Sequence, residues 1–124
     1  MKIAGIGFRD GATLAAILDA LAQAGASGVT RLALPARKQG QPLCEALTTH
    51  GFDLIWIDDT TLATTKTPTQ SAIARRHYGT GSVAEAAALA AARAHGPGAR
   101  LAGPRALSAD RMATAALALT GDPT

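Results

Sequence analysis

Three short apolar segments, each followed by a turn, most constrain what this chain can fold into. They span Lys2–Phe8, Val29–Leu34 and Asp53–Ile57. Apolar residues at helical spacing follow the first segment over Thr13–Ala24 and the second over Leu43–His50. Strands that alternate with helices in this way predict an open α/β sheet that is mostly parallel.

The composition of the 124 residues predicts one folded domain over residues 1–124. Hydrophobic residues make up 48% and charged residues 17%, which excludes a disordered tail protein. Aromatic residues make up 3%, too few for the stacking platforms that bind bases. The net charge of +3, without a long basic run, fits a small polyanionic ligand better than a nucleic acid.

The second half of the chain continues the alternation less clearly. Two helices are expected over Ser71–Tyr78 and Ser82–Arg93, after a polar stretch, Asp58–Gln70, in which Leu62 suggests one docked helical turn. Arg100–Gly103 is typical of a short strand. The final apolar run, in Ser108–Leu119, has the propensity of a helix. If it is a strand, its short connection to the preceding strand requires antiparallel pairing at a mixed edge of the sheet.

Several classes of site are excluded by residue type. The single cysteine, Cys44, excludes a disulfide framework and a thiolate metal cluster. The three histidines, His50, His77 and His95, have no metal-ligand spacing, so no metal is expected. The N-terminus does not resemble a signal peptide, and no apolar stretch approaches the length of a membrane span. These features predict a cytoplasmic protein without a membrane partner.

Glycines mark the turn between the first strand and the first helix, at Gly5, Gly7 and Gly11. Such a turn can bring backbone amides and a helix N-terminus to an anion, but any tight turn also favours glycine, and the spacing leaves both open. A dinucleotide site fits less well, because the spacing is G-x-G-x-x-x-G and not the expected G-x-G-x-x-G. The acidic residue that would bind the ribose about 20 residues further on is also missing, since none lies between Ala20 and Cys44. NADP would need a cationic side chain that binds its 2′-phosphate.

Four cations follow predicted strands closely: Arg9, Arg37, Lys38 and Arg105. The carboxyl ends of strands in an open α/β sheet carry the ligand crevice, and arginine binds carboxylates and phosphates bidentately. Each cation alone is more simply part of a solvated rim. Together they predict a site for a ligand with several acidic groups, and Arg37 is the residue that could bind the phosphate of NADP.

Two carboxylates are candidate site residues. Glu85 follows Ser82 at the spacing of a capping box, in which both side chains bind free amides at a helix start. The same carboxylate could also face a ligand at the mouth of that helix. Asp10, beside the glycine turn, could act as a base or stabilise the turn.

Four segments together resemble the cobalamin-biosynthesis family of CobE and the C-terminal domain of CbiG. Ile3–Gly11 (IAGIGFRDG) resembles the family's opening G-I-G-C-R-x-G, and Leu32–Lys38 is similar to its strand that ends in a lysine. The most specific match is Tyr78–Leu89 (YGTGSVAEAAAL), which resembles G-V-x-S-V-A-E-A-A-A-L. Met112–Ala118 resembles the family's closing strand, T-V-A-L-A.

The resemblance implies a three-layer α/β/α sandwich with a mostly parallel, mixed sheet of about five strands. It favours a strand at Met112–Leu119. It also implies a place in corrin-ring construction: the full-length relative opens the δ-lactone of cobalt-precorrin-5A and releases acetaldehyde. The length of 124 residues leaves no room for that protein's other regions, and it predicts the stand-alone form.

The family's functional positions match in three loops. The matched residues are Gly5, Gly7, Arg9 and Gly11 in the first, Lys38 in the second, and Ser82 and Glu85 in the third. Two residues depart from the pattern. Phe8 stands where the family often has cysteine, which removes any thiol chemistry there, and Gln41 stands where an acid commonly follows the lysine.

These observations favour a protein that binds or hands over a polycarboxylate precorrin or corrinoid and needs no cofactor. The alternatives are a lactone or acyl hydrolase of a precorrin and a small NADP- or nucleotide-binding domain. A hydrolase would use Glu85 or Asp10 as base, with Lys38 stabilising an oxyanion. An assembly role beside precorrin methyltransferases is a further possibility.

Overall fold

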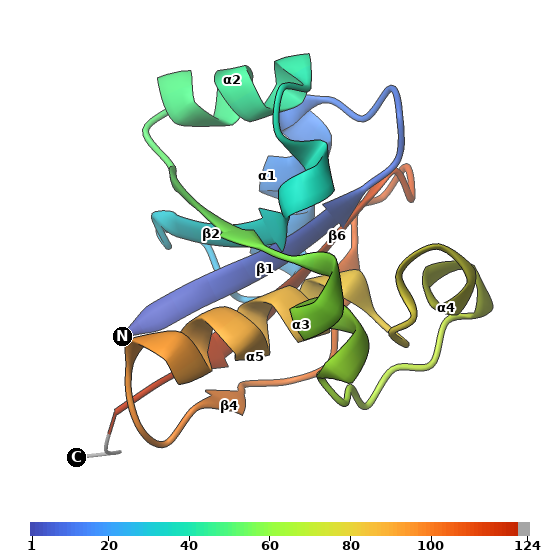
Figure 1. The fold of residues 1–124 in the computed structure, drawn as a ribbon. Helices are drawn as coiled ribbons and strands as arrows, with labels where there is room; N and C mark the ends of the chain where they lie inside the picture. Colours follow the sequence, from blue (N-terminus) through green and yellow to red (C-terminus); the bar gives the residue numbers. More distant parts are fainter. Residues whose placement is uncertain (122–124) are drawn as a thin grey trace.

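A mixed sheet of six strands lies between two layers of helices in the computed structural model, which describes residues 1–121 (Figure 1). The strands are β1 (Lys2–Phe8), β2 (Arg31–Pro35), β3 (Asp53–Ile57), β4 (Arg100–Leu101), β5 (Ala106–Leu107) and β6 (Ala113–Leu119). The helices are α1 (Leu14–Gln23), the short 3₁₀ helix η1 (Ala36–Lys38), α2 (Pro42–Thr49), α3 (Asp59–Thr64), α4 (Ala72–Tyr78) and α5 (Val83–His95). The expected α/β/α class is confirmed.

The sheet has the order β3-β2-β1-β6-β4, with β5 also paired to β6. Strands β1, β2 and β3 are parallel neighbours, whereas β6 is antiparallel to β1, β4 and β5. Thus β6 alone runs against the other strands, as the mostly parallel class implies. It lies inside the sheet and not at its edge, where the sequence pattern had placed the mixed pairing.

The C-terminal apolar run is the strand that the family resemblance implied, and the helix favoured by its propensity is wrong. Strand β6 pairs with β1 along its whole length, from Lys2 opposite Leu119 to Phe8 opposite Ala113. Alanine and leucine favour helices in isolation, but propensity is a weak preference that pairing and burial override. The pairing with β4 is antiparallel, as the short connection requires.

Helices α1 and α2 cover one face of the sheet, and α5 with α3 covers the other (Figure 1). Ile6, Ile17 and Leu47 belong to the core of the first face. On the second face, the buried Leu62 of α3 packs in the core with the alanines of α5. The turn expected at Leu62 is therefore present, and Asp58 caps it by accepting a hydrogen bond from the Thr61 N–H at 2.7 Å.

The two ends of the sheet differ in what surrounds them. At one end the Met1 ammonium donates to the Thr120 carbonyl at 3.0 Å, so the described ends of the chain meet there. At the other end β1 is followed by Arg9 and β2 is followed by η1, close to α4 (Figure 1). The second end carries the pocket described below.

Candidate functional site

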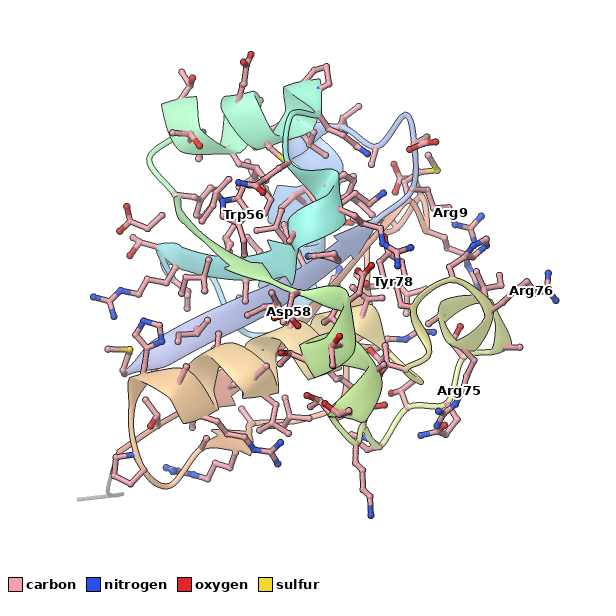
Figure 2. The ribbon with its side chains drawn as sticks, in the orientation of Figure 1. Arg9, Trp56, Asp58, Arg75, Arg76 and Tyr78 are labelled. Atoms are coloured by element: carbon pink, nitrogen blue, oxygen red, sulfur yellow. The ribbon has the colours of Figure 1, made fainter. Side chains whose placement is uncertain are left out.

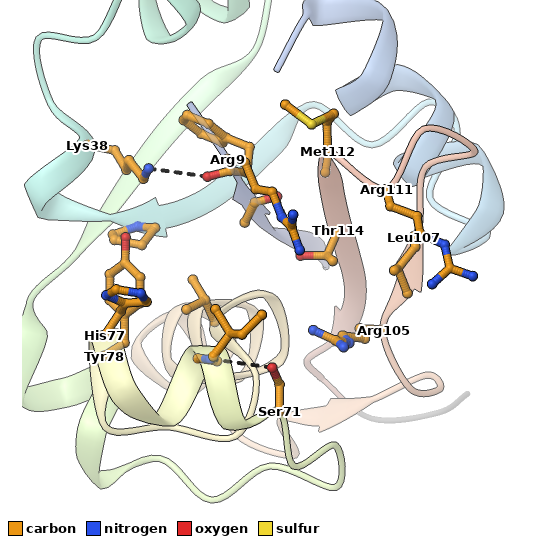
Figure 3. Close-up of a pocket in the computed structure, with 17 residues that line it drawn as sticks. Arg9, Lys38, Ser71, His77, Tyr78, Arg105, Leu107, Arg111, Met112 and Thr114 are labelled. Carbon is orange, nitrogen blue, oxygen red and sulfur yellow. Dashed lines mark hydrogen bonds between the residues drawn. The ribbon is translucent and has the colours of Figure 1, made fainter. Parts of the chain in front are cut away.

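A cavity of about 310 Å³ lies between the ends of β1 and β6, helix α4 and the β5–β6 hairpin (Figure 3). Its size is at the lower end for small-molecule pockets. Its charged and polar lining residues are Arg9, Lys38, Ser71, His77, Tyr78, Arg105, Arg111 and Thr114. Its apolar lining includes Phe8, Pro35, Ile73, Ala74, Val83, Leu107, Met112 and Ala113. None of these lining residues is an aspartate or a glutamate.

Four of the lining side chains are cations: Arg9, Lys38, Arg105 and Arg111. Lys38 donates from Nζ to the Phe8 carbonyl at 3.2 Å and lies 4.8 Å from the centre of the Phe8 ring. Among residues 1–121, none of the four forms an ion pair with a carboxylate. The pocket therefore concentrates positive charge that an acidic ligand can neutralise.

The walls of the pocket also expose apolar surface. Ile73 on α4 is 56% exposed and Leu107 on β5 is 39% exposed, although both are large hydrophobic residues. Both line the cavity, with Phe8 and Val83 deeper in the fold. An exposed apolar surface beside several cations suits a ligand that has an apolar body and acidic substituents.

The sequence expectation that the cations after the strands converge holds for three residues. Arg9, Lys38 and Arg105 line one cavity, although they come from distant parts of the chain. Arg37 does not line it. The pocket also contains Arg111 and His77, which the sequence did not single out as site residues.

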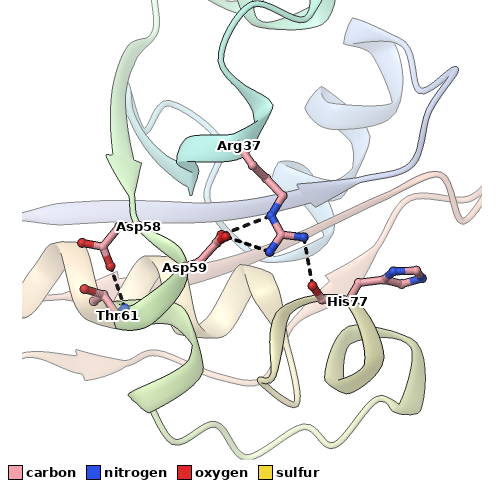
Figure 4. Close-up of polar contacts among 5 residues, drawn as sticks. All are labelled: Arg37, Asp58, Asp59, Thr61 and His77. Atoms are coloured by element: carbon pink, nitrogen blue, oxygen red, sulfur yellow. Dashed lines mark hydrogen bonds and ion pairs between the residues drawn. The ribbon is translucent and has the colours of Figure 1, made fainter.

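Arg37 instead connects η1 to α3 and α4 through polar contacts (Figure 4). Its guanidinium binds both carboxylate oxygens of Asp59, at 3.1 and 2.9 Å, and donates to the His77 carbonyl at 2.9 Å. It also lies over the Tyr78 ring, 4.1 Å from its centre. The hydrogen bond to Asp59 raises the pKa of Arg37, and burial raises the pKa of Tyr78. Arg37 thus supports the wall of the pocket from outside.

Helix α4 belongs to a loop that is closed at its base. The Ser71 N–H donates to the Gly81 carbonyl at 2.7 Å, and the Ser71 hydroxyl caps the helix by accepting from the Ala74 N–H. Arg76 points outward from this loop (Figure 2), whereas the Arg75 guanidinium donates to the Gly79 carbonyl at 3.4 Å and to the Gln70 side-chain oxygen. Both side chains are exposed.

Glu85 lies inside the protein and not at the pocket. Its side chain is 0% exposed and its carboxylate accepts three hydrogen bonds. The donors are the Thr69 N–H at 2.9 Å, the Thr69 hydroxyl at 2.6 Å and the Arg105 N–H at 2.8 Å. Ser82, also 0% exposed, caps α5 by accepting from the Glu85 N–H at 3.2 Å. Half of the expected capping box is present, while the Glu85 carboxylate holds two loops together.

The three glycines that the sequence assigned to the first turn have different surroundings, because Gly5 and Gly7 lie within β1 and only Gly11 lies in the turn. A Cβ at Gly5 would lie 1.9 Å from the Ala84 carbonyl oxygen, so this glycine permits the close packing of α5 on β1. Gly7 lines the pocket, and Gly11 has a positive φ of 87° in the turn before α1. Asp10, in the same turn, is exposed and is not among the lining residues. Packing on α5 explains Gly5 and turn geometry explains Gly11, and a dinucleotide could not approach Gly5.

Arg111 lies in a tight turn between β5 and β6, with a backbone φ of 61°. Its N–H donates to the Ser108 carbonyl at 2.9 Å. The Asp110 carboxylate accepts from the Ser108 hydroxyl at 2.6 Å and from the Met112 N–H at 3.0 Å, and these bonds lower the pKa of Asp110. The sequence could not identify Arg111 as a pocket residue, because Arg111 reaches the pocket only when β5 and β6 pair as a hairpin.

The described part of the chain shows no group of three metal-ligating side chains. Residues 1–121 also contain no helix that is long and apolar enough to cross a membrane. The one cysteine, Cys44, is buried against the first face of the sheet, and burial raises the pKa of its thiol. A raised pKa keeps this thiol neutral and unreactive near neutral pH.

Comparisons with known proteins give a consistent result. Residues 2–118 match the family model described as cobalamin synthesis G C-terminus. The crystal structure of CobE, a protein from the cobalamin (vitamin B12) biosynthetic pathway, is similar with a TM-score of 0.81 and 34% identity, over 98% of this chain and 93% of that one. The cobalamin biosynthesis protein chiG from Agrobacterium tumefaciens strain C58 is similar with a TM-score of 0.68 and 35% identity, over 98% and 100%. No curated protein sequence matches the chain.

Proposed function

Because the chain belongs to the family of the cobalamin synthesis G C-terminus, we propose that its cationic pocket binds a polycarboxylate corrinoid intermediate. Membership of the family assigns the chain to cobalamin biosynthesis. Precorrins and early corrinoids consist of a largely apolar ring with acetate and propionate arms. The pocket offers the complementary surface, apolar walls with cations around them.

One observation carries this proposal. Arg9, Lys38, Arg105 and Arg111 line one cavity, no aspartate or glutamate lines it, and none of the four cations has a carboxylate partner in residues 1–121. Such a concentration of unneutralised charge opposes folding through mutual repulsion. A ligand with several carboxylates relieves that repulsion, and charge-assisted hydrogen bonds are the strongest such contacts that arginine makes.

The arrangement supports binding and hand-over more than hydrolysis. The two carboxylates considered as general bases do not line the cavity: Glu85 is buried with its own partners, and Asp10 lies outside. A base must come within hydrogen-bond reach of the proton that it removes. His77 and Lys38 remain as lining groups that could exchange protons with a ligand. Arg37, the residue that would bind NADP, is occupied by Asp59.

The test is a spectral titration with hydrogenobyrinic acid, a metal-free corrinoid acid. We expect its visible absorption to shift as protein is added and to saturate at one ligand per chain. Lys38→Ala should weaken the affinity about tenfold, the range for one charge-assisted contact, without changing the melting temperature by more than a few degrees.

Lys66→Ala is the matched control, because Lys66 is exposed and is absent from the pocket lining. Its affinity should equal that of the unmodified chain. A flat titration at high protein concentration would overturn the proposal. Release of a fragment from a lactone-bearing precorrin incubated separately with the protein would instead favour the hydrolase alternative.

A further inference from the structure

We infer that Arg111 is a specificity-determining residue that lets the pocket distinguish a free corrinoid acid from the corresponding amide. The inference rests on the proposed function, since it names the side chain that reads the acidic arms. Two observations support it, the position of Arg111 in the pocket and its backbone conformation, together with the donor-only chemistry of a guanidinium.

The position of Arg111 divides the positive charge of the pocket between two sides. Lys38 lies on the side of η1, and Arg105 and Arg111 lie across the cavity on the side of the hairpin, with Arg9 between them (Figure 3). The apolar side chains of Ile73 and Leu107 lie at the exposed part of the same cavity. A ring that carries acidic arms around its circumference offers carboxylates to both sides, whereas a ligand with a single carboxylate offers one.

The backbone of Arg111 is in the left-handed region, with a φ of 61°. Among non-glycine residues this conformation is uncommon and costs free energy, so glycine or asparagine is the ordinary choice. The turn imposes it through bonds that do not involve the Arg111 side chain. Ser108 and Asp110 make them: the Ser108 hydroxyl accepts from the Ala113 N–H at 3.1 Å, and the Asp110 carboxylate accepts from the Met112 N–H.

The Arg111 side chain, in contrast, is exposed and forms no hydrogen bond or ion pair in the described residues. Arg111 therefore adopts an unfavourable backbone conformation although its side chain forms no hydrogen bond or ion pair that stabilises the fold. Strain of this type at a pocket is a pointer to function when an actual backbone outlier shows it. The side chain is available to the ligand.

The chemistry of the guanidinium sets the discrimination. Arginine has five N–H donors and no acceptor, so it binds both oxygens of a carboxylate. A carboxamide offers one oxygen and places an NH₂ group where the second oxygen would be, and this group cannot accept from the guanidinium. Arg111 should therefore favour the acid over the amide on the same ring.

The experiment compares two ligands with the same cobalt–corrin ring, dicyanocobyrinic acid and dicyanocobinamide, whose arms are carboxylates and amides respectively. Affinities are measured by spectral titration for the unmodified chain, Arg111→Gly, Arg111→Gln and a control, Arg93→Gln. Arg93 is exposed near the far end of α5, and its substitution removes the same charge. The unmodified chain should bind the acid at least tenfold more tightly than the amide.

Arg111→Gly should lose about tenfold in affinity for the acid and less than twofold for the amide, a loss of the magnitude expected for one charge-assisted contact. Arg111→Gln should do the same, and Arg93→Gln should keep both affinities within about twofold. Because glycine accepts a positive φ, the melting temperature of Arg111→Gly should stay unchanged or rise by up to about 5 °C. A structural role of the side chain would lower the melting temperature and weaken both ligands.

The outcomes separate the two proposals. If the unmodified chain binds neither ligand, the proposed function fails and this inference fails with it. If the unmodified chain binds the acid and Arg111→Gly binds it equally well, the role of Arg111 is wrong and the proposed function stands. Equal affinity of the unmodified chain for acid and amide, or a parallel loss of both in Arg111→Gly, would likewise overturn the inference.

Discussion

The buried carboxylate of Glu85 accepts a hydrogen bond from the backbone N–H of Arg105 at 2.8 Å. The same carboxylate binds the N–H and the hydroxyl of Thr69. Glu85 therefore joins the start of α5 to the segment before α4 and to the segment that carries Arg105 into the pocket. Its carboxylate holds these segments together through the backbone N–H groups of Thr69 and Arg105 and the Thr69 hydroxyl.

Replacing Glu85 by glutamine should destabilise the protein. Glutamine keeps one acceptor oxygen, but its NH₂ group faces either the Thr69 N–H or, in the other orientation, the Arg105 N–H and the Thr69 hydroxyl. Hydrogen bonds to a buried charge contribute about 1.5–3 kcal/mol. We expect Glu85→Gln to lower the free energy of unfolding by about 2 kcal/mol in urea denaturation. Glu45→Gln, on the exposed face of α2, should change it by less than about 0.5 kcal/mol. Equal stability of the two variants would contradict the role of Glu85.

Gly5 and Gly103 offer a matched pair for the packing of α5 on β1. A Cβ at Gly5 would lie 1.9 Å from the Ala84 oxygen and 2.5 Å from the Ala88 nitrogen, both backbone atoms, whereas a Cβ at Gly103 would meet nothing within 4 Å. Overpacking against backbone cannot relax easily, so Gly5→Ala should cost about 3 kcal/mol or more. Gly103→Ala should stay within about 1 kcal/mol of the unmodified chain. Thermal unfolding measures both, and a fully stable Gly5→Ala variant would refute the packing role.

The turn that holds Arg111 should lose stability at acidic pH. Hydrogen bonds from Ser108 and Met112 lower the pKa of Asp110, so its ionised form is stabilised in the folded state. This stabilisation is present above the ordinary aspartate pKa of about 4 and is lost as the pH falls through the lower, folded value. The protection factor of the Met112 amide, its intrinsic exchange rate divided by the observed rate, should therefore fall below about pH 4. In Asp110→Asn the protection factor should show no such step, and an identical step in both proteins would contradict the role of Asp110.

The sequence predicted most of the fold because the signals for β1, α1, β2 and α5 are local. Apolar spacing marks these elements, and Ser82 marks the start of α5. The C-terminal strand was harder, because alanine and leucine favour a helix until β1 and β5 pair with the segment. The resemblance to a family supplied what local propensity could not.

The site was predictable only in part, for the same physical reason. Arg9 and Lys38 follow parallel strands, so topology alone brings them to one end of the sheet. Gly5 was ambiguous, because an anion-binding loop and any tight turn both favour glycine. The close contact with α5 that Gly5 permits is visible only in the fold. The sequence could not tell that Arg111 lines the pocket and Arg37 does not. Arg37 is paired with Asp59, and the β5–β6 hairpin places Arg111 at the pocket. Both relationships depend on contacts between distant segments.

The most direct test of the central claim is a map of backbone amide shifts by ¹⁵N NMR during titration with hydrogenobyrinic acid. If the cationic pocket binds the corrinoid, the largest shifts should fall on Arg9, Ile73, Leu107 and Met112, which surround the cavity. The amide of His95, at the far end of α5, should not move. Saturable shifts at the pocket residues are the predicted result. Shifts centred elsewhere on the protein, or none at saturating ligand, would contradict the claim.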